Sequence, residues 1–114
     1  NPEEVMLNIK YHFAWNVVSR IPVFRNSESA IDLIDHTITA CSEAVGGFAC
    51  LLWLAPDHLH VYVESDGGVP ADSMAHTIRK KSEISILERF PGIISSSKVE
   101  KRVWDEAYFV ETLG

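Results

Sequence analysis

Residues 54–65 read LAPDHLHVYVES and place two histidines, His58 and His60, two positions apart in a segment with the pattern of a strand. Side chains of a strand alternate between its two faces. The apolar face consists of Leu59, Val61 and Val63. The opposite face groups both imidazoles with Tyr62 and Glu64. The apolar face predicts burial, and the polar face raises the question of why two imidazoles lie side by side.

The spacing of the two histidines allows them to bind one metal ion. Same-face neighbours in a strand are about 7 Å apart at the backbone, so two imidazoles can converge on a shared ligand. Neutral imidazole is the commonest metal ligand in proteins. A half-exposed strand with two solvated histidines has the same pattern, so the pair alone leaves both interpretations open.

The segment before the histidines predicts the other arm of a hairpin. Residues 48–55, FACLLWLA, form a nearly all-apolar run of strand length, which indicates a central strand of a sheet. Pro56 and Asp57 predict the turn. Residues 58–64 then follow as the antiparallel partner.

The remaining segments complete a strand and helix order. Alternation predicts a strand over residues 8–17, and spacings of three and four predict a helix over 29–45, with Asn26, Ser27 or Ser29 as its cap. A second helix is expected over 73–90, ended by Pro91 and Gly92. Two short strand-like pieces, 99–104 and 107–113, close the chain.

This order predicts a ferredoxin-like α+β fold, β-α-β-β-α-β, with an antiparallel sheet and both helices on one face. The histidines then lie on the uncovered face, together with Lys10, His12 and Asn16 of the first strand. Polar side chains from adjacent strands on an open sheet face make a candidate site.

Composition indicates one globular domain over residues 1–114, with 46% hydrophobic and 23% charged residues. No apolar run approaches the roughly 20 residues of a membrane span, and no signal segment opens the chain. Cys41 and Cys50 lack metal-type spacing, so we interpret them as small buried residues of a reducing, cytoplasmic location.

The net charge of −6 argues against a nucleic-acid partner, but the charge is unevenly distributed. Residues 79–102 carry seven of the ten basic side chains and three acidic ones, which leaves the rest of the chain at −10. A basic patch on an acidic protein can still bind phosphate. A solvated helix face explains the same cluster equally well.

Four segments together resemble the single-tyrosine HUH transposases, which include the IS200-like and the repeat-associated tyrosine transposases. The segments are YHFAWNVVSRIPVF (11–24), LAPDHLHVYVE (54–64), IRKKSEISILERFPGI (78–93) and VWDEAYFVETLG (103–114). The resemblance spans residues 10–114, and its most specific element is the His-hydrophobic-His strand after Pro-Asp.

The resemblance implies DNA transposition by cleavage and rejoining of single-stranded DNA at hairpin ends of a mobile element. It implies a divalent cation, Mg²⁺ or Mn²⁺, held by His58 and His60, and a 5′-phosphotyrosine intermediate. The expected DNA contacts are Lys10, His12, Arg79, Lys80 and Lys81. Members of the family are dimers that join sheet edges, so a homodimer is expected, in which pairing covers the last strand.

In the family, the nucleophilic tyrosine lies on a helix after the Thr-x-Gly strand, so the resemblance places it beyond Gly114 and predicts that this chain is inactive by itself. Tyr108 matches a strand tyrosine of the family and is interpreted as a packing or interface residue. Tyr62 is the only other candidate within the sheet. A non-catalytic module that binds DNA hairpins, and a ferredoxin-like interaction domain with an incidental histidine pair, remain alternatives.

Several further side chains receive predictions of their own. We expect His12 to be a hydrogen-bonded sheet histidine and Glu64 to be a candidate supplementary ligand. Trp104 and Phe109 are expected in the core or a dimer interface rather than as base-stacking platforms. The helical histidines, His36 and His76, are expected at the surface.

Overall fold

The order of elements matches the order that the sequence predicts. The computed structural model describes residues 8–25, 27–94 and 102–114. These residues form β1 (Ile9–Val17), α1 (Glu28–Ala40), β2 (Gly47–Ala55), β3 (His58–Ser65), α2 (Ala71–Arg89) and β4 (Trp104–Leu113). Single turns of 3-10 helix follow β1 at Val18–Arg20 and α1 at Glu43–Val45. Among the described residues, no helix is long and apolar enough to cross a membrane.

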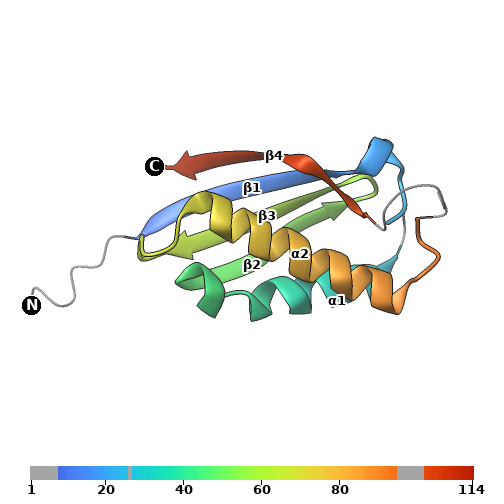
Figure 1. The fold of residues 1–114 in the computed structure, drawn as a ribbon, viewed down its shortest axis with the longest axis horizontal. Coiled ribbons are helices and arrows are strands. Elements are labelled where there is room, and N and C mark those ends of the chain that lie inside the picture. The colour runs from blue at the N-terminus through green and yellow to red at the C-terminus, as the bar shows by residue number, and fades with distance from the viewer. Residues whose placement is uncertain (1–7, 26, 95–101) are drawn as a thin grey trace, which may run out of the picture.

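The four strands of the described chain form one antiparallel sheet in the order β2-β3-β1-β4. Both helices cover the same face of this sheet (Figure 1). The result is the predicted ferredoxin-like arrangement, and β3 and β1 are its central strands. We call the face that the helices do not cover the open face.

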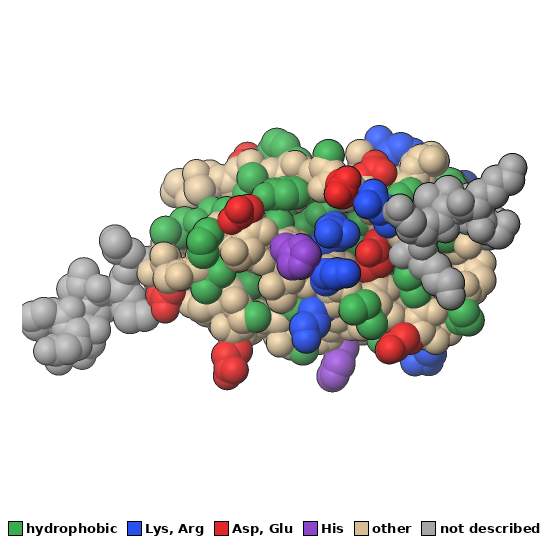
Figure 2. Space-filling view, in the orientation of Figure 1, with side chains coloured by type: hydrophobic (Ala, Val, Ile, Leu, Met, Phe, Trp, Pro, Cys, Tyr) green, Lys and Arg blue, Asp and Glu red, His purple; other side chains and the backbone are tan. Residues whose placement is uncertain are grey.

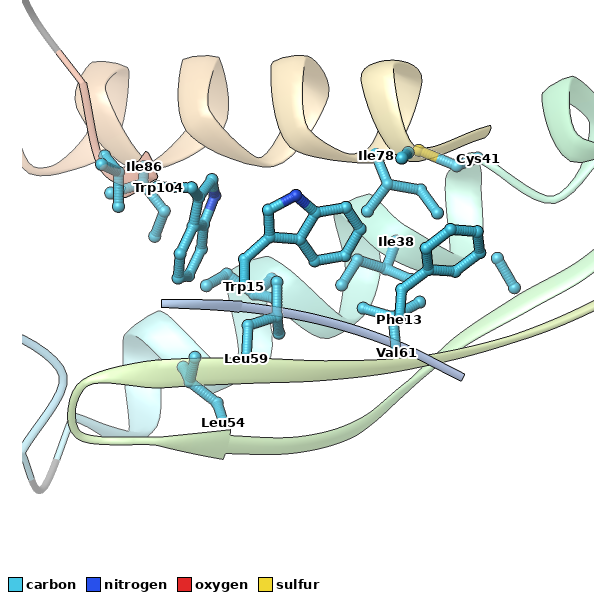
Figure 3. Packing of buried hydrophobic residues seen from close by; sticks show 14 of the residues in the cluster. Phe13, Trp15, Ile38, Cys41, Leu54, Leu59, Val61, Ile78, Ile86 and Trp104 are labelled. Atoms are coloured by element: carbon cyan, nitrogen blue, oxygen red, sulfur yellow. The ribbon is translucent and has the colours of Figure 1, made fainter. Parts of the chain in front are cut away.

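The hydrophobic core lies between the helices and the sheet. Alternation along β1 directs Phe13 and Trp15 into it, where both are fully buried with their ring centres 5.7 Å apart. Ile38 of α1 and Ile78 of α2 pack from the helix layer, as Figure 3 shows. Leu59, Val61 and Val63 of β3 have no exposed area. The apolar face of the histidine strand is therefore buried, as predicted.

The prediction that residues 48–55 form a central strand is wrong, because β2 lies at the edge of the sheet. Its open face carries Phe48 and Trp53, and Leu52 lies at a bulge; they are 48%, 58% and 54% exposed. A continuous apolar run indicates burial on both faces, but here only the helix side of the strand is buried. The apolar residues on the other side need a different explanation.

The boundaries of three elements differ from those predicted by two residues or more. Helix α1 ends at Ala40 rather than at Val45, because a separate 3-10 turn carries the buried Val45 back to the core. Ser27 is the cap, accepting a 3.2 Å hydrogen bond from the Ala30 amide. Helix α2 begins at Ala71, two residues before the predicted start. One strand, β4, replaces the two predicted pieces, and residues 99–101 of the first piece lie outside the described residues.

Candidate nucleic-acid and metal site

A hollow of about 550 Å³ lies on the open face, above the central strands. Its lining residues come from β1, the turn after β1, β3 and β4. They are His12, Ala14, Asn16, Arg20, His58, His60, Ala107, Tyr108 and Phe109. Strand alternation explains this set, because every second residue of β1 and β3 points away from the core. Three histidines thus meet where the sequence placed two on one strand and a third on its predicted neighbour.

His58 and His60 project side by side from β3, with ring centres 5.0 Å apart and ring planes at 76°. The imidazole of His58 is oriented by the turn before it, because its Nδ1 lies 2.7 Å from Oδ1 of Asp57. The other carboxylate oxygen of Asp57 accepts a 3.0 Å hydrogen bond from Nε of Arg20 and forms an ion pair with its Nη2 at 2.9 Å.

Arg20 reaches Asp57 from an unusual backbone turn. Ser19 and Arg20 have φ angles of 56° and 54°, in the left-handed region that non-glycine residues rarely adopt. Backbone strain of this kind is concentrated at functional sites. The turn after β1 thereby brings a cation to the rim of the hollow.

His60 belongs to a second chain of hydrogen bonds, which runs across the sheet. Its Nδ1 lies 2.7 Å from Nε2 of His12, and Nδ1 of His12 lies 2.8 Å from Oε2 of Glu111 in β4. The two imidazole planes are only 17° apart, with ring centres separated by 5.0 Å, so the bond lies in the plane of both rings. The three side chains come from three adjacent strands.

These contacts determine which nitrogens carry protons when the rings are neutral. An ionised carboxylate only accepts hydrogen bonds, so a protonated Nδ1 of His58 donates to Asp57, and a protonated Nδ1 of His12 donates to Glu111. Nε2 of His12 is then an acceptor, and His60 donates to it from Nδ1. Both His58 and His60 are left with an unprotonated Nε2. This is the form in which imidazole binds a metal, with a carboxylate behind it.

Two pKa values in the site are shifted. Burial, followed by the charges of His12 and His58, lowers the pKa of His60, which favours its neutral, ligand-competent form near pH 7. The hydrogen bond from His58, aided by Arg20, lowers the pKa of Asp57 and keeps it ionised. Both shifts favour the protonation states that the hydrogen bonds require.

The structure brings together only some of the residues predicted to contact DNA. His12 is part of the site, and Lys10 is exposed on the open face, opposite Glu64. Arg79, Lys80 and Lys81 lie on α2, which covers the other face, so the sheet separates them from the histidines. Figure 2 shows basic side chains along α2 interspersed with acidic ones. Arg79 itself is paired with Glu83 at 3.6 Å.

The other singled-out residues divide between the two faces. Tyr108 packs its ring against Phe13 and Trp15, with ring centres 6.0 and 5.8 Å away, as the packing interpretation predicts. Tyr62 lies on the open face, where its hydroxyl donates a 3.3 Å hydrogen bond to Glu64. Burial and this carboxylate raise the pKa of Tyr62.

Glu64 is therefore hydrogen-bonded to Tyr62, whereas Glu111 and Asp57 are the carboxylates that contact imidazoles. Sequence reasoning missed both roles. For Asp57 the signal was its position directly before His58. For Glu111 it was the alternation of the last strand, which places Glu111 and Phe109 on one face.

The remaining predictions concern burial. Trp104 is fully buried, but Phe109 is 53% exposed on the open face and is not a core residue. It lies there because Phe109 pairs with Ala14, which faces away from the helices. His36 and His76 are exposed on their helices, as predicted. Cys41 is buried, whereas Cys50 is only half-buried, because it lies on the open face opposite Tyr62.

Comparison with known proteins agrees with this fold and sequence. The family model described as "Transposase IS200 like" matches residues 5–114. The chain belongs to the IS200-like transposase family.

A solved structure supports the same assignment at the level of the fold. The chain is similar to a crystal structure described as a "putative transposase" from Deinococcus radiodurans R1, with a TM-score of 0.77 and 16% sequence identity. The match covers 97% of this chain and 83% of that one. No curated protein matches the sequence.

Proposed function

We propose that this IS200-like transposase domain cleaves and rejoins single-stranded DNA on its open face, with a divalent cation held by His58 and His60. The observation that carries the proposal is the pair of hydrogen-bond chains behind these imidazoles. They leave both Nε2 atoms unprotonated beside a solvent-accessible hollow. The family supports the choice of DNA as the substrate.

The donor set fits a loosely held ion rather than a structural metal centre. No group of three or more His, Cys, Asp or Glu side chains that could hold a metal occurs in the described part of the chain. The protein would therefore supply two ligands, and water and phosphate oxygens would supply the rest. Nitrogen ligands suit Mn²⁺ at least as well as Mg²⁺. Such an ion polarises a phosphate ester when bound.

The surrounding residues would position the reacting groups. Asp57 and Arg20 hold the ring of His58, and Glu111 holds that of His60 through His12. The Arg20 side chain is 57% exposed at the rim of the hollow and can also contact a phosphate.

The proposal assigns the nucleophile to a tyrosine outside these 114 residues. The ring of Tyr108 is on the helix side of the sheet, and Tyr11 also faces the core. Tyr62 is bonded to Glu64, and its raised pKa keeps the phenol protonated. In the proposed step, a tyrosine oxygen attacks phosphorus and its phenol proton passes to solvent, while the bond to the 3′ oxygen breaks and that oxygen takes up a proton. The products are a 5′-phosphotyrosine link and a free 3′-hydroxyl, which attacks the link in the reverse step.

The placement of the tyrosines also favours a second candidate. A module that binds single-stranded DNA hairpins without cutting them would need the same open face and no nucleophilic tyrosine. Metal binding is common to both candidates, whereas a covalent protein–DNA adduct belongs to the first alone.

The first experiment measures Mn²⁺ binding by electron paramagnetic resonance and DNA binding on native and denaturing gels. We expect wild-type protein to bind Mn²⁺, and His58→Ala and His60→Ala each to lose it. His76→Ala, which removes an exposed histidine of α2, is the matched control. Labelled single-stranded hairpins should shift on native gels.

The outcomes separate the candidates. An adduct that survives denaturation, formed only when a longer natural product is used, supports the transposase. An adduct formed by these 114 residues would overturn the assignment of the nucleophile. Mn²⁺ binding that both histidine variants retain would overturn the metal site. If the protein binds no DNA, both candidates are wrong, and the result supports a ferredoxin-like interaction domain.

A further inference from the structure

We propose that Trp53 and Phe109 bind two unpaired nucleobases of the DNA strand, one on each side of the histidine site. The inference rests on the proposed function and adds to it the residues that hold the bases. Nothing in the histidine chemistry requires an aromatic ring, yet two exposed rings flank the hollow.

The two rings belong to one row that crosses all four strands. Register pairs Trp53 with His60, His60 with Ala14, and Ala14 with Phe109. Three inter-strand spacings of about 4.8 Å separate the ends of this row by roughly 14 Å. Ala14, in the middle, has the smallest side chain of the four and leaves the hollow open. This length suits a short stretch of extended single strand, with a phosphate over the histidines.

Trp53 has the orientation of a stacking platform. The bulge between Leu51 and Trp53 places the indole on the open face beside His60. The indole plane is 13° from the plane of that imidazole, with ring centres 5.5 Å apart. It meets the ring of His58 edge-on, with ring centres 5.2 Å apart. It remains 58% exposed, which leaves π surface for another ring.

Phe109 is the counterpart on β4. Its ring meets His12 edge-on, with ring centres 5.7 Å apart, and is 53% exposed. The edge contact with His12 anchors the ring beside the hollow. Proteins that bind single-stranded nucleic acid commonly stack bases on aromatic side chains of an open sheet.

The polar floor between the rings favours DNA over an apolar protein partner. Asn16 is an exposed amide beside His58, Arg20 is a cation, and both His58 and His60 present an unprotonated nitrogen. A protein surface that covered the two rings would bury these groups without partners, which costs free energy. A nucleotide offers a flat base for each ring and a phosphate for the cation.

The test compares two single-stranded probes by fluorescence anisotropy. One is oligothymidylate, and the other is an abasic backbone of the same length, which keeps every phosphate and lacks the bases. We expect wild type to prefer oligothymidylate. Trp53→Ala and Phe109→Ala should each weaken that complex by about 5- to 150-fold, while binding of the abasic strand stays unchanged. Trp53→Phe should restore part of the preference.

Matched controls come from the same strands. Leu52→Ala removes an apolar side chain of similar exposure beside Trp53, and Leu113→Ala does so on the face of Phe109. Both should bind like wild type.

Each result bears on the inference. If wild type binds DNA but the Trp53 and Phe109 variants bind both probes as wild type does, the stacking sites are wrong and the proposed function stands. If wild type binds neither probe, both proposals fall. If Trp53→Ala instead converts a dimer to a monomer in light scattering, a second copy of the chain occupies the surface, and the nucleobase assignment is overturned.

Discussion

At the scale of single residues, the site depends on carboxylates that contact histidines rather than on histidines alone. Asp57 lies next to His58 in the chain, whereas Glu111 acts through His12 and is 99 residues away from it. In each case the carboxylate accepts a hydrogen bond from Nδ1 and so determines which ring nitrogen at the hollow is unprotonated. Glu111 and Asp57 can therefore be tested separately.

Glu111→Gln should reduce the affinity for Mn²⁺ about 10- to 100-fold, because loss of a carboxylate behind a ligating histidine commonly has this effect. Two-bond proton–nitrogen correlation spectra should show His60 protonated at Nδ1 in wild type and a mixture of tautomers in the variant. Glu106→Gln, an exposed change on the same strand, is the control. A wild-type His60 protonated at Nε2 would contradict the hydrogen-bond chain.

Asp57→Asn should flatten the dependence of stability on pH in the acidic range. The pKa of Asp57 is lowered in the folded state, so the unfolded chain binds more protons. The carboxylate therefore contributes stability above about pH 5, and this is lost as pH falls through its folded-state pKa. Urea unfolding between pH 3 and 7 measures the difference, and parallel curves for variant and wild type would contradict it.

At the scale of elements, helix α2 holds the start of β4 through one carboxylate. Oε2 of the buried Glu83 accepts backbone hydrogen bonds from Val103 at 2.7 Å and Trp104 at 3.1 Å. Ser82, beside it, accepts a 3.0 Å bond from the indole of Trp104. The buried polar residues of α2 thus bind the start of β4. Their presence explains why the apolar residues of α2 do not form one continuous face.

Glu83→Ala should destabilise the fold by about 2–4 kcal/mol, because it leaves two buried amides without an acceptor. Glu83→Gln keeps an acceptor oxygen and should cost less. Chemical denaturation of both variants measures the free energy of unfolding. Equal, small losses for Ala and Gln would show that the anchor does not stabilise β4.

The alternation of apolar residues along the sequence predicted some strands and helices correctly and others wrongly. Alternation predicted β1 and β3 to within one residue, because each has one buried and one open face. It failed for β2, where apolar residues on the open face imitate burial on both sides. The spacings of three and four made the predicted helix α1 too long, because Val45 has the helical spacing but reaches the core from a separate 3-10 turn.

At the scale of the whole molecule, the sheet divides the charged groups into two sets. The helix face carries Arg79, Lys80 and Lys81, while Lys10 and Arg20 are on or beside the open face. Acidic side chains lie beside both sets, since Glu83 pairs with Arg79 and Glu64 lies opposite Lys10. A strand of DNA bound at the histidines would reach the basic helix only by passing round an edge of the sheet.

We expect a homodimer in solution, because β4 is an edge strand and its Val110 is exposed. Size-exclusion chromatography with light scattering at micromolar concentration measures this. Val110→Lys should favour the monomer, since charge on an edge strand opposes pairing. Ile84→Lys, at an exposed position of α2, should leave the dimer intact. A monomeric wild type would contradict the expectation.

The sequence alone determined the order of the elements and the face of β3 that carries His58 and His60, because both follow from periodicity within a few residues. Only the tertiary structure decided that Glu111 lies behind His12, that β2 is an edge strand, and that a bulge sets Trp53 beside His60. These features depend on strand register between distant segments, which local patterning does not specify.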